Sequence, residues 1–216
     1  MDAITGRLSR SGRKLIMVAA VAALAVAMAM STRFLTPAEA EAINPAPFNS
    51  QTYAKDAFPK VTAKIKETAV DLVLLVPAVR ADPAAAGAKY GHDLGSGSYA
   101  FPVKATGKVT SVDADFAVLA VPGIPAGSTV RIPLAAAISG SPVRDATGII
   151  TFGDFVDQTD FQSVANQFKL RIQTDVISKL DVASLMGKQL TVFGAYSTIG
   201  AANSYIVQPV SIEVAP

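Results

Sequence analysis

The residues best suited to chemistry lie in one stretch, residues 88–101, with the sequence AKYGHDLGSGSYAF. It contains His92, the single histidine of the 216 residues, next to Asp93 and close to Ser96 and Ser98. These are the parts of a hydrolase triad, in which a carboxylate must face the imidazole. Adjacent residues of an extended chain point to opposite sides, which places His92 and Asp93 poorly for this role. We therefore expect a structural joint, with His92 bonded to nearby backbone or to a carboxylate.

A second candidate pair is Arg144 and Asp145, in the stretch SGSPVRDATGIITFGDF at residues 139–155. An arginine here could form two parallel hydrogen bonds with a carboxylate of a ligand or a partner. The alternative is an internal ion pair that fixes the turn between a strand and a helix. A hydrolase that uses His92 with Asp93 or Asp145 is a further alternative.

Metal and cofactor chemistry finds little support in the composition. The chain has no cysteine and one histidine, so only carboxylates remain as further metal ligands. Asp154, Asp157 and Asp160 lie at a spacing unlike that of an EF-hand loop, and they suit the first turn of a helix. The glycine-rich stretch lacks the Gly-Lys-Ser/Thr ending of a phosphate loop. We predict no metal and no cofactor.

The aromatic residues of the C-terminal half mostly fall on the apolar side of their patterns and are expected in the core. Tyr196 and Tyr205 flank a predicted hairpin turn, where we expect them to be exposed. The residues predicted to contact a ligand or partner are Tyr90, His92, Arg144, Asp145, Tyr196 and Tyr205.

The first element that must be accounted for is an apolar segment near the N-terminus. Residues 15–32 carry no charge and follow Arg7, Arg10, Arg13 and Lys14. As a helix they would be about 27 Å long, close to the thickness of a bilayer core. The basic flank predicts a cytoplasmic N-terminus, with the rest of the chain periplasmic. The motif AEAEA at residues 38–42 could be a cleavage site, but we expect an uncleaved single-pass anchor in the inner membrane.

The charge of the remaining chain argues against nucleic-acid binding. Residues 1–42 hold five of the 19 basic and three of the 17 acidic residues, so 14 of each remain. A neutral domain cannot draw affinity from neutralised phosphates, so an OB-fold nucleic-acid binder is the weakest alternative.

The remaining pattern predicts an α+β protein. Residues 1–42 form a cytoplasmic tip, a membrane helix and a linker. Residues 43–98 form a short helical region, with a kink or a restart at Pro59, a second helix broken near Pro77 and a third starting at Asp82-Pro83. Residues 99–216 show three strands, a helix and two strands, which is the order of a five-stranded OB-like barrel with its helix between strands 3 and 4. A small α+β sandwich is the competing architecture.

Four stretches of the chain resemble one known family. They are NPAPFNSQTYA, ADPAAAGAKYGHDLGSGSYAF, GSPVRDATGIITFGDFVDQTDFQSVAN and VQPVSIEV, which together with their spacing cover nearly all of residues 43–214. They resemble the bacterial predicted periplasmic lipoproteins grouped as domain of unknown function 2291. The resemblance implies an envelope location, no assigned activity and an accessory role beside sugar-uptake ABC transporters. This chain departs from the family label because it has no cysteine to lipidate.

These observations favour a non-enzymatic, membrane-anchored periplasmic protein. We expect it to bind a small ligand or a protein partner, such as a component of a transport system.

Overall fold

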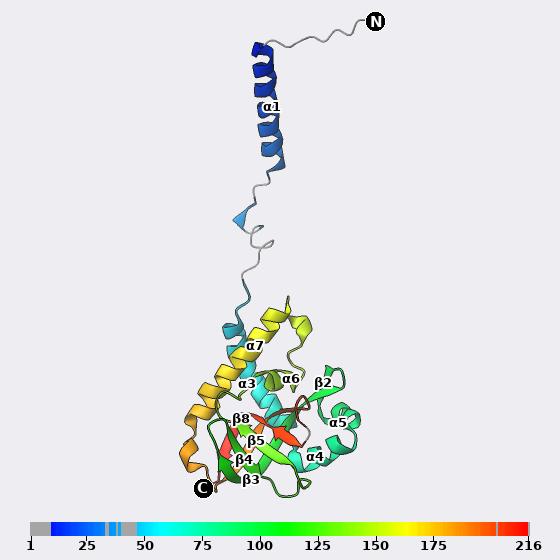
Figure 1. Cartoon of the computed structure of the whole chain (residues 1–216), viewed down its shortest axis with the longest axis vertical. Helices are drawn as coiled ribbons and strands as arrows, with labels where there is room; N and C mark the ends of the chain where they lie inside the picture. The colour runs from blue at the N-terminus through cyan, green and yellow to red at the C-terminus, as the bar shows by residue number, and fades with distance from the viewer. Residues whose placement is uncertain (1–9, 33–34, 38, 40–46, 202, 216) are drawn as a thin grey trace. The chain divides into compact units, whose positions relative to one another are not determined.

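The structure is a computed structural model that describes residues 10–32, 35–37, 39, 47–201 and 203–215. The chain divides into two compact units, Met1–Pro47 and Phe48–Pro216. The predicted cleavage motif at residues 38–42, apart from Glu39, and the basic residue Arg7 lie outside the described residues. Figure 1 shows the elements of each unit along the chain.

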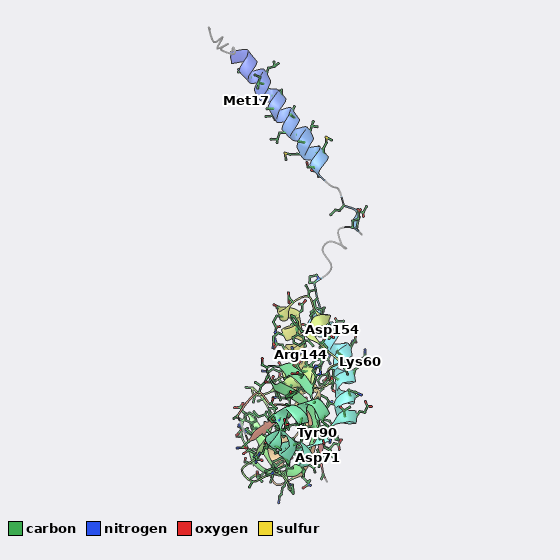
Figure 2. The ribbon with its side chains drawn as sticks, turned by 90° about the vertical axis from the view of Figure 1, so that its right-hand side faces the viewer. Met17, Lys60, Asp71, Tyr90, Arg144 and Asp154 are labelled. Carbon is green, nitrogen blue, oxygen red and sulfur yellow. The ribbon has the colours of Figure 1, made fainter. Side chains whose placement is uncertain are left out.

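The first unit contains the apolar helix α1 (Arg10–Ser31). Its segment Lys14–Ser31 has a mean hydropathy of 2.1 and is exposed throughout, as the outward-pointing side chain of Met17 illustrates (Figure 2). Near the end of the helix, the hydroxyls of Ser31 and Thr32 donate to carbonyls one turn earlier. By length and composition α1 is able to cross a membrane, and a signal sequence has the same properties.

The second unit begins with three helices, α3 (Ser50–Thr68), α4 (Leu72–Ala81) and α5 (Pro83–Tyr90). Each begins at a side-chain cap, provided in turn by Asn49, Asp71 and Asp82. The predicted start at Asp82-Pro83 is therefore confirmed, because Asp82 accepts from two backbone N–H groups and Pro83 takes the first helical position.

The predicted break near Pro77 is wrong, and so is a restart at Pro59, whereas a kink at Pro59 stays a prediction. Pro59 lies inside α3 and Pro77 inside α4, and both helices continue past them. Both prolines are exposed. Water can therefore reach the helix face where the ring removes a backbone hydrogen bond, which makes an unbroken helix tolerable.

The five strands predicted from the pattern are present. They are β3 (Ser98–Val112), β4 (Phe116–Ala120), β5 (Thr129–Pro133), β6 (Gln189–Ser197) and an interrupted last strand made of β7 (Ser204–Ile206) and β8 (Gln208–Val214). Their order in the sheet is β7-β5-β4-β3-β6-β8. The long strand β3 pairs antiparallel with β4 and β6, and its register shifts between Val109 and Ser111.

The interrupted last strand nearly closes the barrel. β7 pairs parallel with β5, whereas β8 pairs antiparallel with β6, so the two pieces join opposite ends of the sheet. Between them, the N–H of Val207 donates to the carbonyl of Arg131 at 3.0 Å. The architecture is therefore an α+β fold with a nearly closed mixed barrel.

Between β5 and β6 lie the short helix α6 (Ser141–Asp145), a 3₁₀ turn (Phe152–Asp154) and the long helix α7 (Gln158–Arg171). A π-helical turn (Ile172–Val176) and two 3₁₀ turns (Ile177–Lys179 and Val182–Ser184) follow. The helix expected between strands 3 and 4 of the barrel is thus α7, and α6 precedes it.

Two further short strands lie outside the five of the barrel. β1 (Val70–Asp71) pairs parallel with β3, and β2 (His92–Gly95) pairs antiparallel with the start of β3. Gly95, Ser96 and Gly97 form the turn with φ values of 84°, 54° and 74°. The stretch expected to be a joint does connect α5 to the barrel, but as a β-hairpin, because these three residues accept the left-handed backbone that a tight turn needs.

The helices and the barrel share one hydrophobic core. Phe58 of α3 meets Phe168 of α7 edge to face, with ring centroids 5.2 Å apart, and the two helices lie side by side (Figure 1). The same core includes Leu72 of α4 and Phe101 and Ile132 of the barrel. The helical region and the barrel therefore pack as one unit, and the domain boundary at residues 98/99 stays a prediction.

Candidate functional site

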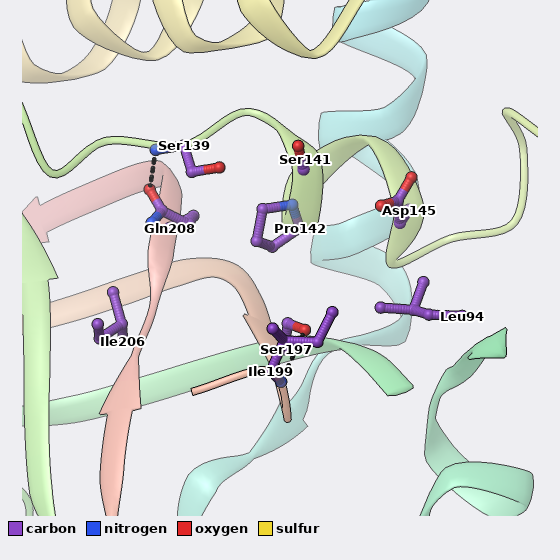
Figure 3. Close-up of a pocket in the computed structure, with 9 residues that line it drawn as sticks. All are labelled: Leu94, Ser139, Ser141, Pro142, Asp145, Ser197, Ile199, Ile206 and Gln208. Atoms are coloured by element: carbon purple, nitrogen blue, oxygen red, sulfur yellow. Dashed lines mark hydrogen bonds between the residues drawn. The ribbon is translucent and has the colours of Figure 1, made fainter. Parts of the chain in front are cut away.

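The best-formed hollow around the predicted site residues surrounds α6. Two adjoining pockets with volumes of about 420 and 260 Å³ share Leu94, Ser141, Asp145 and Ile199 in their linings. We call the combined hollow the α6 cleft. Figure 3 shows the smaller pocket, with Ser141 and Asp145 of α6 on one side and Ser197 and Ile199 on the other. The cleft thus joins segments far apart in the sequence.

His92 lies on β2 and lines the larger pocket. Its ring packs beside Gly148, where a Cβ would stand 2.8 Å from Nδ1 of His92. Gly148 has a φ of 65°, so both its backbone and its lack of a side chain suit this contact. Within the described part of the chain, the imidazole makes no hydrogen bond or ion pair. The expected bond to backbone or carboxylate is therefore wrong, and the ring remains open to the cleft.

Arg144 and Asp145 form the internal ion pair that was one of the two interpretations of this motif. Nε and Nη2 of Arg144 donate to the two carboxylate oxygens of Asp145 at 2.6 and 3.0 Å. Nη1 donates to the carbonyl of Phe161 at 2.8 Å, and the guanidinium carbon lies 3.3 Å from the centroid of the Phe161 ring. Arg144 is only 5% exposed. Arg144 therefore ties α6 to the first turns of α7. Its Nε and Nη2 groups are already used in the hydrogen bonds with Asp145.

Neutral polar groups line the other end of the α6 cleft. The buried side chain of Gln208 accepts from the N–H of Ser139 at 2.9 Å and donates to the carbonyl of Ala137 at 3.4 Å, which fixes the segment before α6 (Figure 3). The hydroxyls of Ser139 and Ser141 have no hydrogen-bond partner among the described residues.

The apolar part of the lining comes from Leu94, Ile150, Phe152, Ile199 and Ile206. Phe152 and Ile199 are 52% and 70% exposed. The lining of the α6 cleft therefore combines hydroxyls, a carboxylate and an imidazole with apolar side chains. This combination is suited to binding a small molecule.

Tyr196 and Tyr205 lie in a second hollow, away from the α6 cleft, and the prediction that they are exposed is wrong. They are 8% and 3% exposed, and their ring centroids are 5.3 Å apart. Burial, with a smaller contribution from Tyr205, raises the pKa of Tyr196 to about 12. The register that pairs Phe101 with Tyr196 stacks the two rings in the core and turns Tyr196 away from solvent.

Tyr90 is the one predicted contact residue that lines neither hollow. It lies at the end of α5, and Nζ of Lys89 is 4.8 Å from its ring centroid. Figure 2 shows Tyr90 and Arg144 on separate parts of the domain. Of the six predicted residues, the structure therefore brings together His92, Arg144 and Asp145 in one hollow and Tyr196 and Tyr205 in another.

The three aspartates after α6 serve the local helix ends, as their sequence positions indicate. Asp154 accepts from the N–H of Thr151 at 2.7 Å, and Asp157 caps α7 by accepting from the N–H of Asp160 at 2.9 Å. A search of the described residues finds no group of three or more metal-ligating side chains placed to hold a metal ion.

Sequence reasoning missed most of the residues that form the two hollows. Ser139, Ser197, Ile199 and Gln208 carry no motif, and they meet only because β6, the last strand and the segment before α6 converge. Arg80 of α4 and Asn203 were also missed in the second hollow.

Residues 19–213 match the model of the family described as predicted periplasmic lipoprotein (DUF2291). The chain belongs to this family. The family description places DUF2291 proteins in association with the membrane on its periplasmic side. No curated protein matches.

A solved structure described as an OB-fold protein from Thermotoga maritima is similar to this DUF2291 chain. The TM-score is 0.63 with 18% identity, over 79% of this chain and all of that one. At this identity the likeness shows the fold alone, and it agrees with the nearly closed barrel. This DUF2291 member contains no cysteine, so it has no residue that could carry a lipoprotein's acyl chain.

Proposed function

We propose that this protein is a non-enzymatic binding module, anchored by α1 in the inner membrane with its N-terminus in the cytoplasm and the domain 48–216 in the periplasm. The supporting observation for anchoring is the exposed apolar segment Lys14–Ser31, in a chain that belongs to a lipoprotein family but lacks cysteine. In this proposal α1 replaces the lipid as the membrane attachment.

The α6 cleft is the proposed binding site. The observation that carries this assignment is that three polar groups of the cleft have no hydrogen-bond partner in the described ranges. They are the imidazole of His92 and the hydroxyls of Ser139 and Ser141. Such groups gain hydrogen bonds when a ligand enters. A hydroxylated small molecule with one apolar face matches the mixture of serines, Asp145 and the exposed Phe152.

An accessory role in sugar uptake is the finer part of this proposal. It draws on the family resemblance and on a cleft whose hydroxyl and carboxylate groups suit a sugar. The exposed apolar side chains at the rim, Phe152 and Ile199, provide a surface for a component of the transport system.

A site-specific crosslinking experiment tests this role. A photo-crosslinking amino acid replaces Ile199 at the rim of the α6 cleft in the full chain, expressed in its own host. The control places it at Leu74, which is similarly exposed on α4 but does not line the α6 cleft. We expect position 199, and not 74, to crosslink a permease or a solute-binding protein identified by mass spectrometry. Recovery of the protein alone from both positions would reject the transport role.

The second candidate function is a hydrolase based on His92, favoured by its free imidazole in a cleft that also contains Asp93 and Asp145. General acid–base work needs a histidine within about 3 Å of the groups that exchange its proton. The chain with His92→Asn and the unchanged chain are compared on ester and glycoside substrates. Turnover that is lost with His92→Asn would replace the binding proposal with the enzymatic one.

A further inference from the structure

A second hollow, with a volume of about 450 Å³, lies where α4 and α5 meet the end of β6 and the last strand. Its lining includes Arg80, Ser98, Thr198, Asn203 and Tyr205. We call it the Arg80 cleft, and we infer that it binds a small hydroxylated monocarboxylate through the guanidinium of Arg80. This inference is independent of the function proposed for the α6 cleft.

The guanidinium of Arg80 is held in place by neutral groups. Nε donates to the hydroxyl of Tyr205 at 3.2 Å, and Nη2 donates to the hydroxyl of Ser128 at 2.9 Å. Ser128 is itself fixed, because its hydroxyl donates to the carbonyl of Pro125 at 2.7 Å. Two of the five N–H groups of the arginine are thus used, one on Nε and one on Nη2, and the other three, including both on Nη1, have no hydrogen-bond partner among the described residues. Hydrogen bonds from a guanidinium to a carboxylate are charge-assisted and therefore strong.

Of the four arginines of the domain, Arg80 and Arg131 form no ion pair with a carboxylate of the described residues, and Arg131 is stacked on Phe116 whereas Arg80 lines a cleft. Arg144 pairs with Asp145, and Arg171 lies 3.6 Å from Asp175. For Arg80, the part of the chain that the structure describes provides no carboxylate within ion-pair distance. A positioned guanidinium with no internal counter-charge is complementary to an external anion.

The net charge of the side chains that line the cleft indicates how much negative charge the ligand should carry. Arg80 is the only charged side chain among the described residues that line the cleft. One positive charge balances a monocarboxylate, whereas a phosphate monoester, with a charge between about −1.5 and −2 at neutral pH, would retain excess negative charge.

The neutral groups around Arg80 suit the body of such a ligand. The carboxamide of Asn203 and the hydroxyl of Ser98 have no hydrogen-bond partner within the described ranges, and they can bond to ligand hydroxyls. Asn203 is held at a φ of 68°, and its carbonyl accepts from the N–H of Thr129 at 2.8 Å, so its backbone is positioned by the barrel.

Arg80 also lies in the last turn of α4, where a positive charge stabilises the helix dipole. That role needs only the charge. The variant Arg80→Lys keeps the charge and removes the planar fork, so it separates the structural role from ligand binding.

The test uses the ¹⁵N-labelled full chain in detergent micelles, with lactate, its neutral counterpart lactamide, and methyl phosphate as probes. The Nε–H resonance of Arg80 and the side-chain amide of Asn203 are followed by NMR. We expect saturable shifts with lactate at millimolar concentrations and none with lactamide. Arg80→Lys should weaken lactate binding at least tenfold, while Arg131→Lys, which alters an arginine stacked on Phe116, should leave it within twofold.

Three outcomes would overturn the inference: no saturable shift with lactate, equal shifts with lactamide, or unchanged affinity in Arg80→Lys. Methyl phosphate that binds tenfold more tightly than lactate would also reject the carboxylate assignment. The variant Tyr205→Phe, which keeps the ring and removes the hydroxyl that holds Nε, should weaken lactate binding about threefold. Amide spectra that match the unchanged chain show that each variant is folded.

Discussion

The guanidinium of Arg144 lies over the ring of Phe161 and donates to the carbonyl of the same residue. Its remaining side-on N–H groups form two hydrogen bonds with Asp145. One buried side chain therefore joins α6 to α7 through a carboxylate, a carbonyl and an aromatic face. The wall of the α6 cleft depends on this junction, because Arg144, Asp145 and Phe161 all line it.

Replacing Arg144 by Met is expected to lower the free energy of unfolding by about 3 kcal/mol, because a largely buried Asp145 is left without its partner. The control is Arg171→Met, which breaks a more exposed pair with Asp175 and should cost less than about 1 kcal/mol. Urea unfolding followed by tyrosine fluorescence measures both, since the chain has no tryptophan. If both variants lose the same free energy of unfolding, the buried ion pair contributes no more to stability than the exposed one.

Gly148→Ala should disturb His92 directly. A Cβ at this position would stand 2.8 Å from Nδ1 of the imidazole, and the φ of 65° adds a cost of about 1–2 kcal/mol. The control is Gly97→Ala, which has a φ of 74° but no atom within 4 Å of the added Cβ. Both variants should lose stability, while the ring resonances of His92 should move only in Gly148→Ala. Unmoved resonances there would contradict the close packing of these two residues.

Phe168→Ala tests whether the helices and the barrel form one cooperative unit. Phe168 is fully buried in the core that the helices share with the barrel and lies edge to face with Phe58 of α3, so its truncation should cost about 3–5 kcal/mol. Leu170→Ala on the same helix removes a half-exposed side chain and should cost less than about 1 kcal/mol. Near- and far-ultraviolet circular dichroism should report a single shared transition for each variant. Separate transitions would mean that the helical region unfolds on its own.

The largely buried side chain of Tyr196 should make stability depend on alkaline pH. Its pKa is raised from 10.0 to about 12 in the folded state, mainly by burial. Between these values the unfolded chain loses the proton that the folded chain keeps, so the free energy of unfolding falls as pH rises through this window. Below pH 10 the stabilisation is complete. Tyr196→Phe should remove this part of the pH dependence, and an unchanged slope in urea unfolding would reject the assignment.

The N-terminal helix should remain attached to the mature protein. We expect mass spectrometry of protein from native membranes to find residues 15–32, and alkaline carbonate to leave the protein in the membrane pellet. Leu24→Arg places a charge in the middle of α1, at a cost of about 2.5–3.5 kcal/mol, and should release part of the protein. Leu74→Arg, at an exposed position on α4, should release none. A mature chain that starts after residue 42 would show that α1 is a cleaved signal.

Sequence periodicity predicted the barrel because several strands alternate between buried and less buried residues over part of their length, as residues 103–110 of β3 do. The alternation in Ser98–Val112, followed by two strands, α7 and two further strands, matches the observed order. The hairpin β2 was missed because its turn, Gly95, Ser96 and Gly97, contains the residues that also mark open loops. Four residues of strand are too few to show a period.

The site was predictable only in part, because its geometry depends on contacts between distant segments. The pairing of Arg144 with Asp145 follows from adjacency and was one of two interpretations. Tyr196 and Tyr205 flank a turn, which suggests exposure, but the strand register directs both rings inward. The packing of His92 could not be predicted, since it involves Gly148, which lies 56 residues further along the chain.

The interrupted last strand has a consequence for how the protein is made. Both of its seams, β7 on β5 and β8 on β6, use residues 204–214, which follow all the other strands of the barrel along the chain. While the polypeptide is still leaving a ribosome or a secretion channel, neither seam exists, and the edges of β5 and β6 stay open to wrong partners. A nascent chain that stops before Ser204 should therefore be sensitive to proteases and prone to aggregate. The unpaired edges of β5 and β6 are protected only once residues 204–214 have been added.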